Sequence, residues 1–302
     1  MDCSKFNMYK TAGDIINLVM EIAIELCNKK MKASHICAYC DSIIIDKLNQ
    51  SYKKLNKGIM LPTCLSINSV VSHNSYSEDN DYEFNDGDIV RIEMACHVNY
   101  NVASLGETIK IGDEKWKESK ILNAAVKAMQ VGVQIIKPGT EVIEFKNYIE
   151  KVVNKLGYYL VERPYLFQDE DCEISYDWCH RNNGFFCEPS WIVRNDKELF
   201  LYDEDELSDE EFDKEKIFTK GEAYNITVAI SNNPKNTVES TKPNQIFQKT
   251  KNVYQLKSKY SRELLNYIIN KYDNCCWKIT NLEIPENRAR LGLKECIDHG
   301  LI

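Results

Sequence analysis

The sequence predicts an α+β protein built as one domain across residues 1–302. Helix-like spacing of apolar residues gives way to strand-like alternation, and the order helix, helix, strands occurs once in each half of the chain. No long linker separates these halves, which we place roughly at 8–132 and 133–302. The hydrophobic fraction of 43% and the charged fraction of 28% are ordinary for a globular protein. These observations favour one domain with two similar halves over two independent domains.

Two amphipathic helices open the first half. Apolar residues in Thr11–Met31 recur every three or four positions, which is the helical period. Ser34 then stands where a helix N-cap is expected, and the apolar residues after it share one face of the second helix. These residues are Ile36, Cys40, Ile43, Ile44 and Leu48.

Strand-like alternation follows these helices. Met60–Val71 alternates loosely and predicts one strand. Ile89–Met94 and Thr108–Ile111 predict an antiparallel pair, with the turn near Asn99–Asn101. The first half is therefore expected to contain a small antiparallel sheet beside its two helices.

The order of elements then repeats with less regular patterns. Asp113–Val131 predicts a helix that ends at Gly132, and Val142–Leu156 predicts the next helix. The later elements are strands at Ala223–Ser231 and Asn244–Val253, then helices at Ser261–Asp273 and Pro285–His299.

The net charge of −8 at pH 7 is unevenly distributed along the chain. Residues 196–215 contain eleven acidic residues and two lysines, a local charge of −9 that leaves +1 on the other 282 residues. Such a run is typical of a solvated loop, and we interpret it as an acidic insertion. The acidic total therefore does not exclude a nucleic-acid partner.

A basic and aromatic stretch lies between Thr241 and Arg262. It contains no acidic residue, and Phe247, Tyr254 and Tyr260 are interleaved with its cations. This composition suits contacts with phosphates and stacking on bases, although a solvated surface is the alternative interpretation. The candidate RNA-binding residues are Lys242, Lys249, Lys251, Lys257, Lys259 and Arg262.

The sequence shows no motif of a cofactor or membrane site. HExxH, GxSxG, Walker and GxGxxG patterns are missing. Cys37 and Cys40 form a CxxC pair near His35, but no second pair completes a zinc site. With no visible signal peptide, the cysteines are expected to be reduced. The most apolar stretch, Ile15–Cys27, is interrupted by three polar residues and is too short to cross a bilayer. We expect no metal, cofactor or membrane partner.

Five short motifs occur in a fixed order along the chain. They are Tyr9-Lys10-x-x-Gly13-Asp14-Ile15; Lys57-Gly58-Ile59-x-x-Pro62-Thr63, followed by Ser66, Asn68 and His73; Asp86-Gly87-Asp88-Ile89-Val90-Arg91-Ile92, followed by His97; Gly221-Glu222-x-Tyr224; and Arg288-x-Arg290-x-Gly292-x-x-Glu295-Cys296-x-x-His299. The ordered set resembles the pita-bread methionine aminopeptidase family (peptidase M24), and within it the non-peptidase proliferation-associated, or ErbB-binding, branch. The resemblance implies a pita-bread fold, in which two pseudo-repeated halves form a curved antiparallel sheet flanked by helices. The family's last strands would follow the final motif, and the chain stops at Ile302 before them.

The resemblance also implies where a dinuclear metal site would lie. Active relatives use two Asp, one His and two Glu, whose four carboxylates balance two divalent cations. The first two Asp positions correspond to Glu93 and Ser104, the first Glu to Thr227, and the His to His180 within a residue or two. At most one carboxylate remains, and neutral hydroxyls are poor bridging ligands. We therefore expect a pseudo-peptidase with a vestigial pocket, and His73 beside it in the position of the family's substrate-facing histidine.

With catalysis lost, the resemblance implies a binding function. Relatives in this branch dock on the large ribosomal subunit near the peptide exit, touching ribosomal RNA and proteins there, so the expected partners are the same. The chain is then expected to be a cytoplasmic monomer, with the nucleus and nucleolus as further locations, that affects ribosome biogenesis or translation. Two alternatives stay open: a residual metal-dependent methionine aminopeptidase, and a module that binds a peptide in the old groove.

Overall fold

The computed structural model describes residues 3–160, 217–232 and 246–302, except residues 29, 69, 71, 114, 116, 117, 219, 222, 225, 227 and 251. The helices are α1 (Cys3–Leu26), α2 (Ala33–Gln50), α3 (Lys120–Ile135), α4 (Val142–Lys155), α6 (Lys259–Lys271) and α7 (Glu286–Asp298). The strands are β1 (Lys57–Ile67), β2 (Ile89–Val98), β3 (Asn101–Lys110), β4 (Tyr159–Leu160), β5 (Ile230–Ser231), β6 (Ile246–Phe247) and β7 (Trp277–Lys278).

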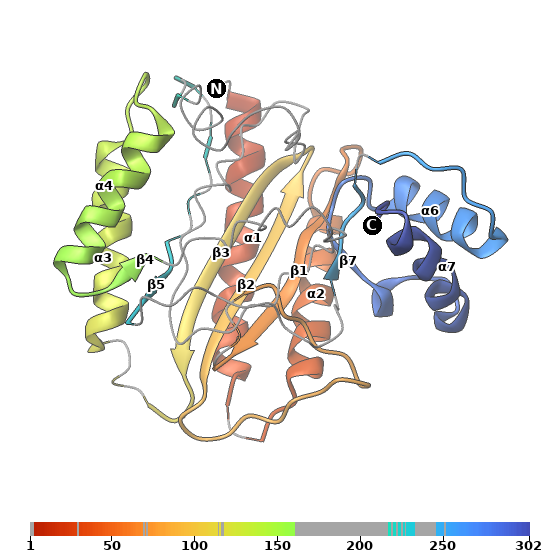
Figure 1. Ribbon diagram of the computed structural model, residues 1–302, viewed down its shortest axis with the longest axis horizontal. Coiled ribbons are helices and arrows are strands. Elements are labelled where there is room, and N and C mark those ends of the chain that lie inside the picture. The colour runs from red at the N-terminus through yellow and green to blue at the C-terminus, as the bar shows by residue number, and fades with distance from the viewer. Residues whose placement is uncertain are drawn as a thin grey trace.

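A three-stranded antiparallel sheet, in the order β1-β2-β3, forms the centre of the first half. Figure 1 shows α1 running behind this sheet and α2 beside β1. The β2–β3 register is regular from Ile89 opposite Lys110 to Val98 opposite Asn101, as the predicted hairpin requires. The β1–β2 register shifts on both sides of Leu61, next to Pro62, which has no amide hydrogen to give to a ladder.

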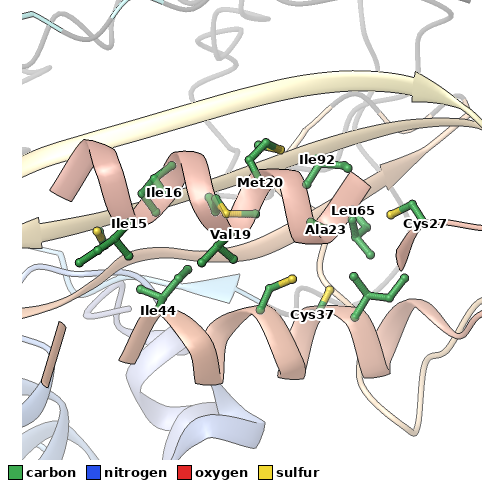
Figure 2. Packing of buried hydrophobic residues seen from close by; sticks show 14 of the residues in the cluster. Ile15, Ile16, Val19, Met20, Ala23, Cys27, Cys37, Ile44, Leu65 and Ile92 are labelled. Atoms are coloured by element: carbon green, nitrogen blue, oxygen red, sulfur yellow. The ribbon is translucent and has the colours of Figure 1, made fainter. Parts of the chain in front are cut away.

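The core of this half lies between the sheet and the two helices. Figure 2 shows Met20 and Ala23 of α1 next to Ile92 and Leu65 of the strands, with Ile16 of the same cluster farther along α1. Apolar residues every three or four positions on the helices and every second position on the strands make this layer possible. The helices predicted here are confirmed, but Ser34 does not cap α2: Lys32 is the N-cap residue, and the Ser34 hydroxyl and amide donate to Asp81.

Helices α3 and α4 pack together, and Gly132 lies inside α3 instead of ending it. A Cβ atom on Gly132 would lie 2.8 Å from Cδ1 of Ile149 and 3.0 Å from Phe145. The glycine therefore allows α4 to approach closely, and α3 continues to Ile135. The prediction that Gly132 terminates the helix was wrong because a glycine in a close helix contact resembles a helix-ending glycine in sequence.

The C-terminal residues form a compact unit that contacts the edge of the central sheet. Figure 1 shows α6, α7 and β7 on the β1 side of the sheet. The amide of Cys276, just before β7, donates to the carbonyl of Met60 at 3.0 Å. A Cβ on Gly292 of α7 would meet the Tyr260 carbonyl oxygen at 2.7 Å, so glycine is required where α7 crosses α6.

Two of the predicted strands are much shorter in the described residues. Only Ile230–Ser231 of Ala223–Ser231 pairs, with β4, and only Ile246–Phe247 of Asn244–Val253 pairs, with β7. The apolar alternation in the first segment reflects packing instead, since Tyr224, Ile226 and Val228 lie against the α3–α4 core.

Two expectations from the sequence stay predictions. The acidic insertion at 196–215 lies outside the described residues, and the division into halves at 8–132 and 133–302 stays a prediction. No helix in the described ranges combines the length and apolarity needed to cross a membrane.

Candidate functional site

The central strand β2 presents its residues alternately to two environments. Val90, Ile92, Met94 and Cys96 face the core shared with α1 and α2. The intervening residues Arg91, Glu93, Ala95 and His97 therefore lie on the opposite face of the sheet. All four are nevertheless buried. We therefore take this polar, buried face of β2 as the candidate functional site.

Glu93 is held by two donors from the protein itself. Its Oε1 lies 3.0 Å from Nη2 of Arg91, and its Oε2 accepts the backbone amide of His73 at 2.9 Å. The side chains of Arg91 and Glu93 are only 10% and 9% exposed. Both carboxylate oxygens are thus engaged, and the charge of Glu93 is balanced by a guanidinium.

Ser104 lies on the same sheet face as Glu93 but on β3, opposite Ala95. Its side chain is exposed, and Gly106 is the residue directly opposite Glu93. A diagonal pair of this kind is separated by roughly 7–8 Å between Cα atoms. The structure therefore places the two hairpin positions on one face of the sheet, and the second of them carries a neutral hydroxyl in place of a carboxylate.

His73 lies in the segment that follows β1, with a left-handed backbone at φ 53°. That conformation is uncommon for a residue with a side chain, and here it coincides with the amide contact to Glu93. The structure thus places His73 beside Glu93, and the His73 backbone provides the contact. His180 and Thr227, the other two predicted positions, lie outside the described residues.

His97 has a structural role, as its position near the hairpin turn predicts. Its Nδ1 accepts the Tyr100 amide at 3.2 Å, which leaves the proton of the neutral ring on Nε2, 3.5 Å from Sγ of Cys275. Burial lowers the pKa of His97 to about 4, because desolvation disfavours the charged ring more than Asp273 favours it. The ring also stacks on Tyr100, whose hydroxyl donates to Asp273 at 2.9 Å.

A second buried ion pair joins α2, in the N-terminal part of the chain, to β7, in its C-terminal part. Nζ of Lys278 on β7 lies 2.7 Å from Oδ2 of Asp41 on α2, with both side chains at most 6% exposed. The other oxygen of Asp41 accepts the Thr63 amide at 2.7 Å, and Lys278 also donates to the Ser75 hydroxyl. Desolvation lowers the pKa of Lys278, but the Asp41 carboxylate outweighs it, so the pKa is raised. The pair ties β7 to α2 and β1.

The sequence interpretation missed Arg91 and Lys278. Both positions had a weak signal, since each cation lies within or next to an apolar run: Ile89–Met94 for Arg91 and Cys275–Trp277 for Lys278. A charged residue in such a run is expected to be buried and paired. The partner could not be identified, because Asp41 is far from Lys278 in sequence.

The described residues provide little for a metal ion. Within them, no group of three or more His, Cys, Asp or Glu is arranged to hold one, the CxxC pair at Cys37 and Cys40 included. At Glu93, the guanidinium of Arg91 already lies where a cation would be attracted and would repel it. The residues present at this position therefore do not fit a dinuclear centre.

The basic stretch lies at the start of the C-terminal unit. Lys257 and Lys259 are exposed, and Lys249 is half-buried, with Nζ donating to the Thr250 carbonyl at 3.1 Å. The Arg262 guanidinium donates to the carbonyls of Leu256 and Lys257, so it also holds the loop before α6. Lys242 and Lys251 lie outside the described residues.

Comparison with known proteins links this geometry to a family. The sequence model of metallopeptidase family M24 matches residues 7–181. An ErbB-3 binding protein 1 of Arabidopsis thaliana is 28% identical over 300 residues, covering 97% of this chain and 70% of that protein. Proliferation-associated protein A of Dictyostelium discoideum is 26% identical over 303 residues, with 97% and 72% coverage.

One further relative and one solved structure are also similar to this chain. A protein of Schizosaccharomyces pombe named curved DNA-binding protein is 25% identical over 305 residues, covering 98% of this chain and 74% of its own length. The solved structure of a thermophilic Arx1 superposes with a TM-score of 0.76 at 18% identity, covering 100% of this chain and 82% of that one. This likeness shows the fold, so the expected pita-bread α+β architecture is confirmed.

Proposed function

The chain belongs to metallopeptidase family M24, and we propose that it is a non-catalytic member that binds the large ribosomal subunit. The proposal that the chain is non-catalytic rests on the contacts of Glu93. Its two carboxylate oxygens are occupied by Arg91 and the His73 amide, so a protein cation stands where hydrolysis would need metal ions. The names of the relatives, an ErbB-3 binding protein and a proliferation-associated protein, fit a non-catalytic role.

The basic stretch supports the second part of the proposal. Lys257 and Lys259 are exposed next to exposed Tyr254 and Tyr260, and residues 241–262 contain no acidic side chain, although the Glu295 carboxylate of α7 binds the backbone amides of Lys257 and Ser258. Phosphate contacts from such a surface give affinity that falls steeply with salt. A relative named for binding curved DNA is consistent with a nucleic-acid surface in this lineage. Among nucleic acids we favour ribosomal RNA near the peptide exit, as the sequence resemblance implies, with ribosomal proteins there as secondary contacts.

Co-sedimentation with purified large subunits tests the proposal. Changing Lys249, Lys251, Lys257 and Lys259 together to Glu is expected to abolish binding, because four attractive charges become repulsive. The matched control changes Lys127, Lys137, Lys151 and Lys155 to Glu, which alters the net charge equally on α3, α4 and the residues between them. If the first variant still co-sediments like the control, the assignment of the basic stretch is wrong.

Two further features belong to the same proposal. We propose that the chain acts as a monomer in the cytoplasm, with the nucleus and nucleolus as further locations, where it affects ribosome biogenesis or translation. Size-exclusion chromatography with light scattering and imaging of a fluorescent fusion test these points. Binding that persists after ribosomal RNA is digested, and that is insensitive to salt, would instead favour a peptide-binding module.

A further inference from the structure

A stacked aromatic pair lies next to the basic stretch, at the end of α7. The rings of Tyr254 and His299 are parallel within 17°, with centroids 3.6 Å apart. Both residues are exposed, and the neighbouring Val253 side chain is 97% exposed. Each ring covers one face of the other, and both residues still expose part of their surface.

The loop that carries Tyr254 is fixed to α7 on both sides of the ring. Before it, the side-chain amide of Asn252 donates to the Gly300 carbonyl at 3.0 Å. After it, the backbone amides of Lys257 and Ser258 donate to the Glu295 carboxylate at 2.8 and 3.0 Å. The aromatic pair is therefore preorganised, which reduces the entropy lost when a ligand binds.

The same contacts place a cation beside the pair. Glu295 and His299 are four residues apart, so they lie on one side of α7 about 6 Å apart along its axis. Lys257 is attached through its amide to Glu295, and its side chain is exposed. The backbone amides of Lys257 and Ser258 lower the pKa of Glu295, which keeps its carboxylate ionised and bound to this loop. The backbone of Lys257 is thus attached to α7 one helical turn before the ring of His299, and its exposed side chain starts from there.

We propose that Tyr254 and His299 form a stacking platform for an unpaired base, with Lys257 contacting the adjacent phosphate. The inference rests on the proposed function, because it names the part of the nucleic acid, an unpaired base with its phosphate, that the basic stretch would contact. A flat ring presents its face to any base, but only an unpaired base has a free face to offer. A duplex, whose bases already stack on each other, would contact the lysines alone.

Fluorescence anisotropy with the full chain and a labelled single-stranded RNA tests this platform across a salt series. Tyr254→Ala is expected to weaken binding by about tenfold while leaving the slope of log affinity against log salt unchanged, since stacking releases no counterions. Lys257→Gln is expected to reduce that slope by roughly one phosphate contact. Tyr254→Phe keeps the ring and should bind as the natural chain does. Tyr148→Ala is the control, because Tyr148 is an exposed tyrosine on α4, 46% exposed against 36% for Tyr254.

The results distinguish a failure of the stacking platform from a failure of the proposed function. If Tyr254→Ala binds single strands normally while the lysine-to-Glu variant does not, the platform is wrong and the proposed function stands. If neither the natural chain nor any variant binds RNA, the proposed function itself fails. Photo-crosslinking of the natural chain to a 4-thiouridine RNA gives an answer that does not depend on the variants folding: crosslinks at Tyr254 or His299 support the platform, and crosslinks confined to other residues overturn it.

Discussion

Removing one partner of the Arg91–Glu93 pair should destabilise the fold strongly. The charges are 3.0 Å apart and about nine-tenths buried, so either partner alone would be left in a poorly solvated site. Breaking a buried pair in this way costs about 3–5 kcal/mol. Glu93→Gln removes the charge but keeps an oxygen that can accept the His73 amide, so its effect isolates the loss of the ion pair with Arg91.

Thermal and urea unfolding followed by circular dichroism measure this cost. For a chain of this size, about 3–5 kcal/mol corresponds to a fall in Tm on the order of 10 °C. The double variant Arg91→Met with Glu93→Gln removes both charges, so it should be more stable than either single variant. A matched control is the exposed pair Lys10–Asp14, whose disruption should cost less than about 1 kcal/mol.

Two results would refute this reasoning. Single variants as stable as the natural chain would mean that water or another group compensates the charge. A double variant that loses the full sum of the single losses would mean that Arg91 and Glu93 do not interact energetically.

Three further predictions concern the fold. Gly132→Ala should cost about 1–3 kcal/mol, because its new methyl group would overlap α4, whereas Gly13→Ala, with nothing within 4 Å, should stabilise α1 by about 0.5–1 kcal/mol; urea titration compares the two, and equal effects would contradict the packing. His97 has a pKa of about 4 in the folded state against 6.5 in the unfolded state, so the unfolded state binds more protons between these values and stability should fall as pH drops from 6.5 to 4. His97→Gln should remove that dependence, and an unchanged pH profile would rule out this residue as its source. Lys278→Met should cost about 3–5 kcal/mol by leaving Asp41 buried without its cation, and adding Asp41→Asn should recover part of that loss in the same assay.

Local patterns were enough to predict the elements of the first half. The hairpin over Ile89–Ile111 follows from alternation on both arms and from a short polar turn, and the structure confirms it with an uninterrupted register. Helices were predicted as reliably, because one apolar face is a local property of the chain. Gly132 was misread because its reason for being glycine is the side chains of α4, which its neighbours in sequence do not reveal.

The candidate site was only partly predictable. The resemblance named Glu93 and His73 as pocket residues, and the structure joins them through a hydrogen bond, while their role stays a prediction. It did not reveal that Arg91, two residues away on the same strand face, neutralises Glu93, because alternation alone does not say which polar residues on a face are buried. His180, Thr227, Lys242 and Lys251 lie outside the described residues, so their predicted roles stay predictions.

The metal content of the purified chain, determined by mass spectrometry after incubation with Mn²⁺, Co²⁺ or Zn²⁺ and dialysis, tests the central claim most directly. Because Arg91 already balances Glu93, we expect no stoichiometric metal and no release of methionine from an N-terminal methionyl peptide in the same samples. Two equivalents of bound metal together with methionine release would contradict a non-catalytic role and would restore the aminopeptidase alternative.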